Sequence, residues 1–206
     1  SGSTGTPKGV VVSSENLLHN LRNIASLFRF TEGSRVVSWL PHFHDMGLVG
    51  SILTSLYAGA QCILLSPVDF IQKPYRWLKA VSEYGGTLAG APNFAYDLCV
   101  SKIRGEQVDT LDLRSWGIAW NGSETIRAST IAAFAEHFRR AGFRKEAFAP
   151  CYGLAEATLM VTGCGPHTEN KIISITRSSH LSGESVELAA IPSAETQELV
   201  GCGKSF

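Results

Sequence analysis

The sequence alternates between short runs rich in β-branched and small apolar residues and amphipathic stretches of roughly ten to fifteen residues. The short runs, which we expect to be strands, are 35–40, 61–65, 87–91, 116–121 and 147–152. The amphipathic stretches, which we expect to be helices, are 17–28 (after the candidate N-caps Ser13 and Ser14), 47–57, 74–84, 93–103 and 128–141. Strands separated by such helices form a largely parallel sheet with helices on both faces. The alternation therefore predicts an α/β fold.

The character of the chain changes near residue 163. Ser, Thr, Glu and Gly dominate from there to Gln197, with two short β-like runs at 172–176 and 186–191. We therefore expect an α/β region over 1–165 and a β- or loop-rich extension over 166–206. The sequence also begins inside a glycine-rich loop, so we expect it to be an internal fragment of a longer protein.

Composition and charge exclude several classes of protein. With 44% hydrophobic and 17% charged residues, the 206-residue chain is too apolar for a disordered protein and too lightly charged for a coiled coil. Its 18 Lys+Arg and 18 Asp+Glu give zero net charge, which argues against nucleic-acid binding. The five cysteines form no CxxC pair, which favours free thiols in a reducing compartment, so we expect a cytoplasmic protein.

One uncharged segment is long enough to cross a bilayer. It runs from Met46 to Leu65 without a charged residue. Glycine, serine, threonine and glutamine interrupt it, and a Gly59-Ala60 break divides it. A helix followed by a buried strand accounts for it better, and we expect no membrane span.

Ligands of parallel α/β sheets bind beyond the carboxyl ends of the strands. This rule singles out four segments, 41–47, 90–93, 121–125 and 152–158. In the first, His42, His44 and Asp45 resemble part of a hydrolase metal cluster, but the other histidines lack ligand spacing. The alternatives are a histidine that lines a pocket and an Asp45 that caps a helix starting at Met46.

The opening loop, Ser1 to Gly9, contains glycines, hydroxyl groups and Lys8. Glycine lets backbone N–H groups approach an anion, hydroxyls donate hydrogen bonds and lysine adds positive charge, so the loop favours phosphate binding. The alternative is a flexible linker. It is not a Walker loop, because Pro7 stands where that motif needs glycine.

The segment Tyr152 to Thr158 follows an expected strand, and we expect it to enter a helix. Tyr152 has a flat ring on which a base could stack, and Glu156 offers a hard oxygen ligand for Mg²⁺ beside phosphates. The alternative is that Glu156 is an acidic residue in the first helical turn, which the helix dipole favours.

Three motifs together resemble those of the adenylate-forming superfamily, which contains acyl-CoA synthetases, peptide-synthetase adenylation domains and luciferases. The loop 1–9 resembles its phosphate loop, 121–124 its adenine-side motif and 152–158 its Tyr-Gly-x-Thr-Glu motif, in family order. Within the superfamily, 44–48, 91–96 and the alanine before Glu156 resemble the fatty acyl-AMP ligases. The polar segment near 166–200 stands where those enzymes have an insertion.

The resemblance implies a reaction and its partners. A fatty acid and ATP, with Mg²⁺, give acyl-AMP and pyrophosphate. The acyl group then passes to an acyl carrier protein of a polyketide or nonribosomal-peptide assembly line, because the insertion is associated with acyl-adenylate that is not passed to coenzyme A.

The resemblance also implies site residues, all present in this sequence. The catalytic residues are His44, Glu156 and Lys8, and the metal ligands are Thr4 and Glu156. The expected ATP- or AMP-binding residues are Ser1, Gly2, Ser3, Thr4, Gly5, Lys8, Asn121, Gly122, Ser123, Glu124, Tyr152, Gly153, Leu154 and Ala155. The expected substrate-binding residues are His44, Asp45, Met46, Gly47, Asn93 and Phe94.

The sequence departs from the family pattern at a few positions. Ser123 and Thr125 replace the usual alanine and proline, and Gly201 stands where serine is expected. The ribose-binding aspartate and the C-terminal lid with its catalytic lysine would lie beyond Phe206, so we expect residues 1–206 alone to be inactive. Three other functions stay open, namely a fatty acyl-CoA synthetase, a non-catalytic adenylate-binding module and a metal-dependent hydrolase.

Overall fold

The computed structural model describes residues 9–166, 171–176, 188, 193 and 195–205. Its main sheet has the strand order β2-β1-β3-β4-β5-β6-β9. The strands are β1 (Arg35–Ser38), β2 (Gln61–Leu64), β3 (Leu88–Ala91), β4 (Ile118–Asn121), β5 (Phe148–Gly153), β6 (Met160–Gly163) and β9 (Lys204–Ser205). The first five strands pair in parallel, whereas β6 and β9 are antiparallel additions.

The strand order reverses at β1. This strand pairs with β2 on one side and with β3 on the other. Every residue of β3 and of β4 is buried, as expected for parallel strands covered on both faces. At such a reversal the connecting segments diverge, which leaves a crevice beyond the carboxyl ends of the strands.

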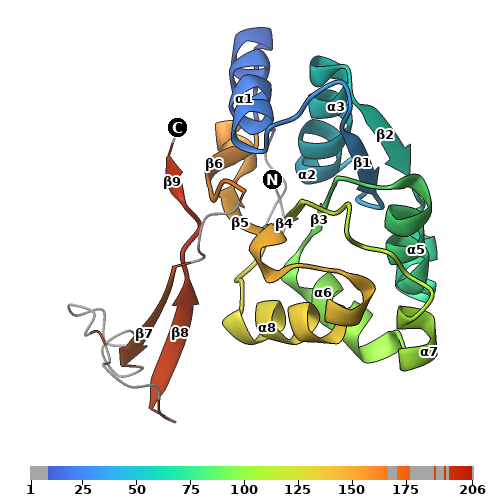
Figure 1. Ribbon diagram of the computed structural model, residues 1–206. Helices are drawn as coiled ribbons and strands as arrows, with labels where there is room; N and C mark the ends of the chain where they lie inside the picture. Colours follow the sequence, from blue (N-terminus) through green and yellow to red (C-terminus); the bar gives the residue numbers. More distant parts are fainter. Residues whose placement is uncertain (1–8, 167–170, 177–187, 189–192, 194, 206) are drawn as a thin grey trace.

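Helices cover both faces of the sheet (Figure 1). On one face, α1 (Ser14–Leu27) packs on η1 (Leu48–Leu53) and α3 (Thr54–Ala58). On the other face, α6 (Asn93–Lys102) packs on α8 (Ala128–His137). The remaining helical segments are α2 (Asp45–Gly47), α4 (Pro67–Gln72), α5 (Tyr75–Tyr84), α7 (Gly105–Val108), η2 (Arg139–Ala141), η3 (Lys145–Ala147) and η4 (Ala155–Ala157). The predicted α/β fold is confirmed.

Several local details differ from the expectation. The helix expected over 47–57 begins at Asp45 and contains a π-helical segment, η1. The hydroxyl of Thr54, the first residue of α3, donates to the Val49 carbonyl of that segment at 2.7 Å. The helix expected over 128–141 is α-helical to His137, and a 3₁₀ turn then leads to Gly142 with φ of 87°. Helix α4 was not predicted, because a single short turn after Ser66 has no measurable periodicity.

An aromatic cluster packs helices α5, α6 and α8 against the sheet. The rings of Trp77 and Trp116 lie 5.2 Å apart, and Tyr96 lies 5.0 Å from both Phe134 and Phe148, all in edge-to-face geometry. All five side chains are fully buried. Edge-to-face ring pairs stabilise the fold by more than the burial of their apolar area alone. This cluster therefore supports the strands whose ends form the site.

The end of the described chain forms a separate two-stranded sheet. Strand β7 (Ile172–Thr176) pairs antiparallel with β8 (Thr196–Val200), and the pair extends away from the main sheet in Figure 1. The chain then returns to β9, beside β6. The β-like run expected at 186–191 lies outside the described residues except for Leu188, which bridges to Ile175.

The uncharged segment from Met46 to Leu65 forms most of α2 and all of η1, α3 and β2. No helix in the described part of the chain combines the length and the apolar character that crossing a membrane requires. All five cysteines belong to described residues, and each is a free thiol.

Candidate functional site

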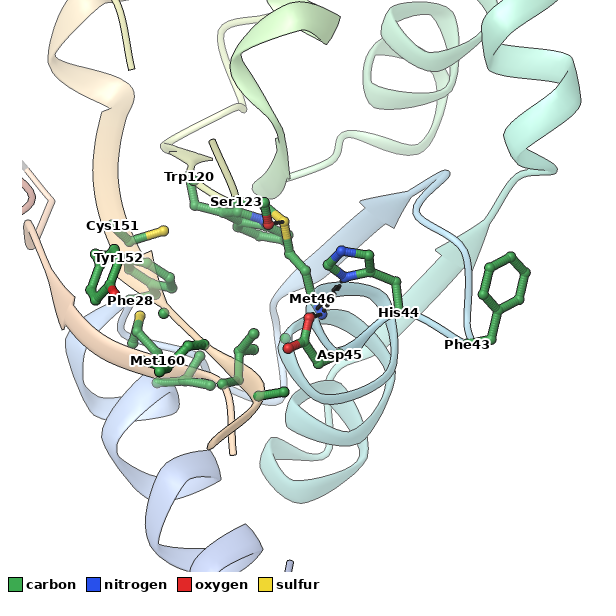
Figure 2. A pocket seen from close by; sticks show the side chains of 17 residues that line it. Phe28, Phe43, His44, Asp45, Met46, Trp120, Ser123, Cys151, Tyr152 and Met160 are labelled. Atoms are coloured by element: carbon green, nitrogen blue, oxygen red, sulfur yellow. Dashed lines mark hydrogen bonds and ion pairs between the residues drawn. The ribbon is translucent and has the colours of Figure 1, made fainter. Parts of the chain in front are cut away.

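A cavity of about 520 Å³ lies beyond the carboxyl ends of β1, β4 and β5 (Figure 2). Its volume is within the roughly 300–1,000 Å³ typical of small-molecule sites. Three of the four segments selected by the strand-end rule contribute to its wall. The lining residues are Ile24, Phe28, Phe43, His44, Asp45, Met46, Gly50, Trp120, Gly122, Ser123, Cys151, Tyr152, Gly153, Leu154, Ala155, Leu159 and Met160.

The segment after β1 places His44 and Asp45 in the cavity wall at the start of α2. Asp45 Oδ1 lies 2.8 Å from His44 Nδ1 and 2.7 Å from the Met46 backbone nitrogen. Nδ1 also lies 3.2 Å from that backbone nitrogen. A ring nitrogen that donates to Asp45 cannot also accept, so the two shorter contacts define the network and Asp45 Oδ1 accepts both N–H groups.

This contact shifts both side chains electrostatically. The hydrogen bond to Asp45 raises the pKa of His44 above its usual value, and the same bond lowers the pKa of Asp45. The structure refines the expected capping role, because His44 occupies the N-cap position and Asp45 is the first helical residue. The Asp45 carboxylate still accepts the Met46 N–H, so it satisfies a free backbone donor of the first turn, as an N-cap side chain would.

The loop after β4 brings Gly122 and Ser123 to the cavity. A Cβ on Gly122 would lie 2.9 Å from Cys151 Sγ and 3.0 Å from the Cys151 carbonyl, so only glycine permits this close approach of β4 and β5. Ser123 has φ of 68°, an unfavourable region for a non-glycine residue. Its hydroxyl lies 3.0 Å from Met46 Sδ, which connects this loop to α2.

Five predicted binding residues in the described part of the chain lie outside the cavity wall, namely Gly47, Asn93, Phe94, Asn121 and Glu124. Asn121 is fully buried, and its amide donates to Asn93 Oδ1 at 3.4 Å. Asn93 in turn donates to Thr130 at 3.0 Å. Glu124 accepts the Phe94 backbone N–H at 2.6 Å, at the first turn of α6. These side chains hold the β4 loop on α6.

The end of β5 forms one side of a hairpin with β6. Tyr152 is 53% exposed, and Figure 2 shows its ring at the cavity beside Cys151. Gly153 packs against the returning strand so closely that a Cβ would lie 2.0 Å from the Leu159 carbonyl. Burial raises the pKa of the Cys151 thiol to about 12, so the thiol is uncharged at neutral pH.

The helix expected after Tyr152 is not formed. Residues Ala155–Ala157 make a single 3₁₀ turn, and Thr158 follows with φ of 71° and ψ of −57°. The Leu159 N–H donates to the Ala157 carbonyl at 2.9 Å, which makes a strained γ-turn. The Leu154 N–H donates to the Leu159 carbonyl at 2.8 Å and closes the hairpin. This cross-strand hydrogen bond uses a backbone N–H and a backbone carbonyl that a helix would pair within itself.

Several cavity residues were not predicted as site residues. Ile24 comes from α1 and Phe28 is the C-cap residue of that helix, whose apolar stripe predicts ordinary core packing. The ring of Phe28 stacks on that of Trp120, with the centroids 6.2 Å apart. Leu159 and Met160 come from the hairpin. Helix α1 is joined to that hairpin by Asn20, whose amide donates to the Met160 carbonyl at 2.8 Å. No local pattern in the sequence indicates these contacts.

The donor set decides which metal chemistry fits the site. The described residues contain no group of three His, Cys, Asp or Glu side chains able to hold a metal ion, so His42, His44 and Asp45 offer no hydrolase centre there. Mg²⁺ typically takes one or two carboxylates and completes its shell with phosphates and water. Glu156, exposed beside the cavity residue Ala155, fits that mode.

The expected phosphate loop, Ser1–Gly5 with Lys8, lies outside the described residues. The predicted approach of Thr4 to Glu156 therefore stays a prediction.

A parallel sheet with a cavity beyond its strand ends, glycines at close backbone approaches and an exposed aromatic ring defines an α/β protein that binds a small ligand at the strand ends. The chain belongs to the family of AMP-binding enzymes, whose family model matches residues 1–191. The family recognised from the motifs is thereby confirmed.

Curated relatives are fatty-acid ligases. A medium-chain-fatty-acid–[acyl-carrier-protein] ligase, TtuA of Teredinibacter turnerae, is 43% identical over 203 residues, which are 98% of this chain and 31% of that protein. A long-chain-fatty-acid–AMP ligase, FadD26 of Mycobacterium marinum, is 38% identical over 98% of this chain and 35% of its own length. This chain thus spans about a third of the curated relatives it matches.

Solved structures agree with these relatives. A fatty acyl-adenylate ligase from L. pneumophila, solved with acyl adenylate and pyrophosphate, superposes with a TM-score of 0.92 at 47% identity. The match covers 99% of this chain and 36% of that one. The described fold is therefore that of part of an adenylate-forming enzyme.

Proposed function

We propose that the full-length protein is a fatty acid–AMP ligase. It joins a fatty acid to the AMP part of ATP, releases pyrophosphate and passes the acyl group to an acyl carrier protein. The observation that carries this proposal is the cavity, because the motif segments that meet there belong to a chain 47% identical to a ligase solved with acyl adenylate and pyrophosphate. The name of TtuA supports the carrier protein as acceptor.

The chemistry needs no general base. A fatty carboxylate is already ionised at neutral pH, and one of its oxygens attacks the α-phosphorus while pyrophosphate leaves. The barrier comes from the meeting of two anions and from charge that develops on the α-phosphoryl oxygens. The residues at the cavity therefore act by binding, orienting and neutralising.

The cavity offers a distinct surface to each part of the acyl-adenylate. The exposed ring of Tyr152 stacks on adenine, and Gly122 and Gly153 line the same cavity. Phe28, Trp120 and Met160 supply apolar surface for the acyl chain. His44 lines the cavity at the start of α2, where a cationic imidazole offsets charge on the α-phosphate.

The proposal includes ATP and Mg²⁺. Mg²⁺, when bound, neutralises charge on the phosphates, and we assign Thr4 and Glu156 as its protein ligands. Ser1–Gly5 and Lys8 hold the phosphates. The free thiols support a reducing compartment, and we place the enzyme in the cytoplasm.

We also keep the proposed division of the chain. Residues 1–165 form the α/β part of the adenylate-forming domain. The insertion-like segment and the start of the next β region lie in 166–206. The separate β7–β8 sheet supports this division.

Coenzyme A is the main alternative acceptor. A putative fatty-acid–CoA ligase of Mycobacterium tuberculosis, fadD25, is 39% identical over 78% of this chain. The test is a product assay on the full-length protein with lauric acid, ATP and Mg²⁺, alone, with coenzyme A, or with a holo acyl carrier protein. We expect pyrophosphate and acyl-AMP in every arm, acyl–carrier protein in the third and no thioester in the second. A coenzyme A thioester would overturn the acceptor, and no pyrophosphate at saturating ATP would leave an adenylate-binding module.

A further inference from the structure

Few charges line the cavity in the described part of the chain. The titratable side chains there are His44, Asp45, Cys151 and Tyr152. A phenol and a thiol are uncharged near neutral pH, and burial raises the Cys151 pKa further. His44 and Asp45 are thus the two cavity-lining side chains that carry charge, and they contact each other at 2.8 Å.

Other titratable groups near His44 face elsewhere or lie outside the wall. From the β4 loop, the Glu124 carboxylate accepts the Phe94 N–H. From the hairpin, Glu156 is exposed and does not belong to the wall. Helix α1 contributes the apolar side chains Ile24 and Phe28. The immediate electrostatic partner of His44 is therefore Asp45.

The Asp45 carboxylate is held in place. Its Oδ1 accepts the Met46 backbone N–H at 2.7 Å, and Met46 is itself buried and contacts the Ser123 hydroxyl. Both close polar contacts of the His44 ring in the described structure involve Nδ1, and the shorter one is the hydrogen bond to Asp45. With Nδ1–H committed to Asp45, Nε2 is left for a ligand, and the side chains remain 52% and 27% exposed.

The charge balance matters for a reaction between anions. A carboxylate alone in this wall would repel both a fatty carboxylate and a phosphate. Paired with an imidazolium it adds no net charge, and the pair presents the Nε2–H donor of His44 to the cavity. The hydrogen bond that orients the ring also favours its protonated form.

We propose that Asp45 is a positioning residue that orients His44 through Nδ1 and keeps Nε2–H as a cationic donor to the α-phosphoryl oxygens. The inference rests on the proposed function for the identity of the acceptor oxygens. The coupling between Asp45 and His44 does not depend on the proposed function.

The test uses the full-length protein and the substitution Asp45→Asn. Asparagine keeps an oxygen that can accept the Met46 N–H, but it removes the negative charge. Histidine-selective ¹³C NMR, with His44→Gln used to assign the signal, measures the pKa of His44. We expect a value above the usual 6.5 in the wild type and a lower value in Asp45→Asn. The matched control is Asp69→Asn, which breaks the exposed 2.6 Å ion pair with Arg76 away from the cavity.

Kinetics supply the second readout. Because the cationic form of His44 is the active one, pyrophosphate release should decline as pH rises through its pKa, and Asp45→Asn should move that decline in kcat/KM to lower pH. A shift of one unit makes the variant about tenfold slower than wild type above both pKa values, with a much smaller difference below them. Asp69→Asn should keep the wild-type profile.

The outcomes separate the two proposals. An unchanged His44 pKa and an unchanged pH profile in a folded Asp45→Asn protein would overturn the positioning role. A wild-type protein that forms no acyl-AMP at any pH would overturn the proposed function, and the NMR titration would still decide whether Asp45 controls His44. If Asp45→Asn does not fold, a wild-type His44 pKa at or below 6.5 would overturn the inference.

Discussion

At the scale of residues, the backbone of the site depends on two glycines and on two residues with positive φ. Gly122 and Gly153 are required because a Cβ at either position would enter space that β5 or the β5–β6 hairpin occupies. The strained φ values of Ser123 and Thr158 lie in the same two loops. Backbone strain of this kind persists where surrounding contacts determine the loop, and it is common at functional sites.

The carboxylate of Glu156 gives a prediction at the same scale. Glu156→Ala in the full-length protein removes the proposed Mg²⁺ ligand from an exposed turn, so the fold should remain intact. We expect kcat to fall by about 10²–10³, by analogy with loss of one transition-state donor. Pyrophosphate release measured over a Mg²⁺ series checks it. The control is Glu106→Ala, an exposed glutamate in α7, and wild-type turnover of Glu156→Ala at low Mg²⁺ would contradict the assigned role.

At the scale of elements, the site depends on how loops are fastened to helices. The β4 loop is held on α6 through Glu124 and Asn93, and α1 is held on the hairpin through Asn20. Each fastening pairs a side chain from one element with a group of another, and the Glu124 and Asn20 bonds reach backbone groups. The cavity wall is thereby assembled from elements distant in sequence.

The contact between Glu124 and α6 can be measured as stability. Glu124→Ala leaves the Phe94 N–H without its acceptor, and we expect the free energy of unfolding to fall by about 1 kcal/mol, as for loss of a helix cap. Urea denaturation followed by circular dichroism measures it. Glu124→Gln keeps an acceptor oxygen and should lose less, and Glu146→Ala, an exposed residue of η3, serves as the control. Equal loss in the alanine and glutamine variants would argue against capping.

At the scale of the whole molecule, one aromatic core supports the strand ends. Trp77 is fully buried, and its ring meets those of Trp116, Tyr96 and Phe70 at 5.2, 5.8 and 5.7 Å. Helices α4, α5 and α6 and the segment just before β4 are packed together through these rings, so the core fixes the sheet from which the site loops emerge.

Loss of the Trp77 side chain should reduce the stability of the fold and should affect function only through that loss. We expect Trp77→Ala to lower the free energy of unfolding by about 3–5 kcal/mol, because it leaves a large cavity among rings that cannot all collapse. Leu56→Ala, at a side chain 72% exposed, should change it by less than about 0.5 kcal/mol. Thermal unfolding of the full-length variants distinguishes them, and similar melting temperatures would show that Trp77 does not carry the core.

The sequence determined what depends on near neighbours. Helix and strand periodicity predicted the α/β fold, Ser13 caps α1 in a capping box with Asn16, and the expected strand at 172–176 is β7. The motifs at the strand ends located the cavity, because parallel strands carry their carboxyl ends to one edge.

Only the tertiary structure decided which side chains line that cavity. In the folded protein, Glu124 and Asn121 contact the start of α6, Asn121 through the side chain of Asn93. Phe28, at the end of α1, lies against Trp120. The tertiary structure also made a hairpin where a helix was expected, because β6 pairs with β5 and Asn20 binds Met160 across 140 positions of the chain. Such contacts leave no periodic trace in the sequence, since their partners become neighbours only when the sheet has formed.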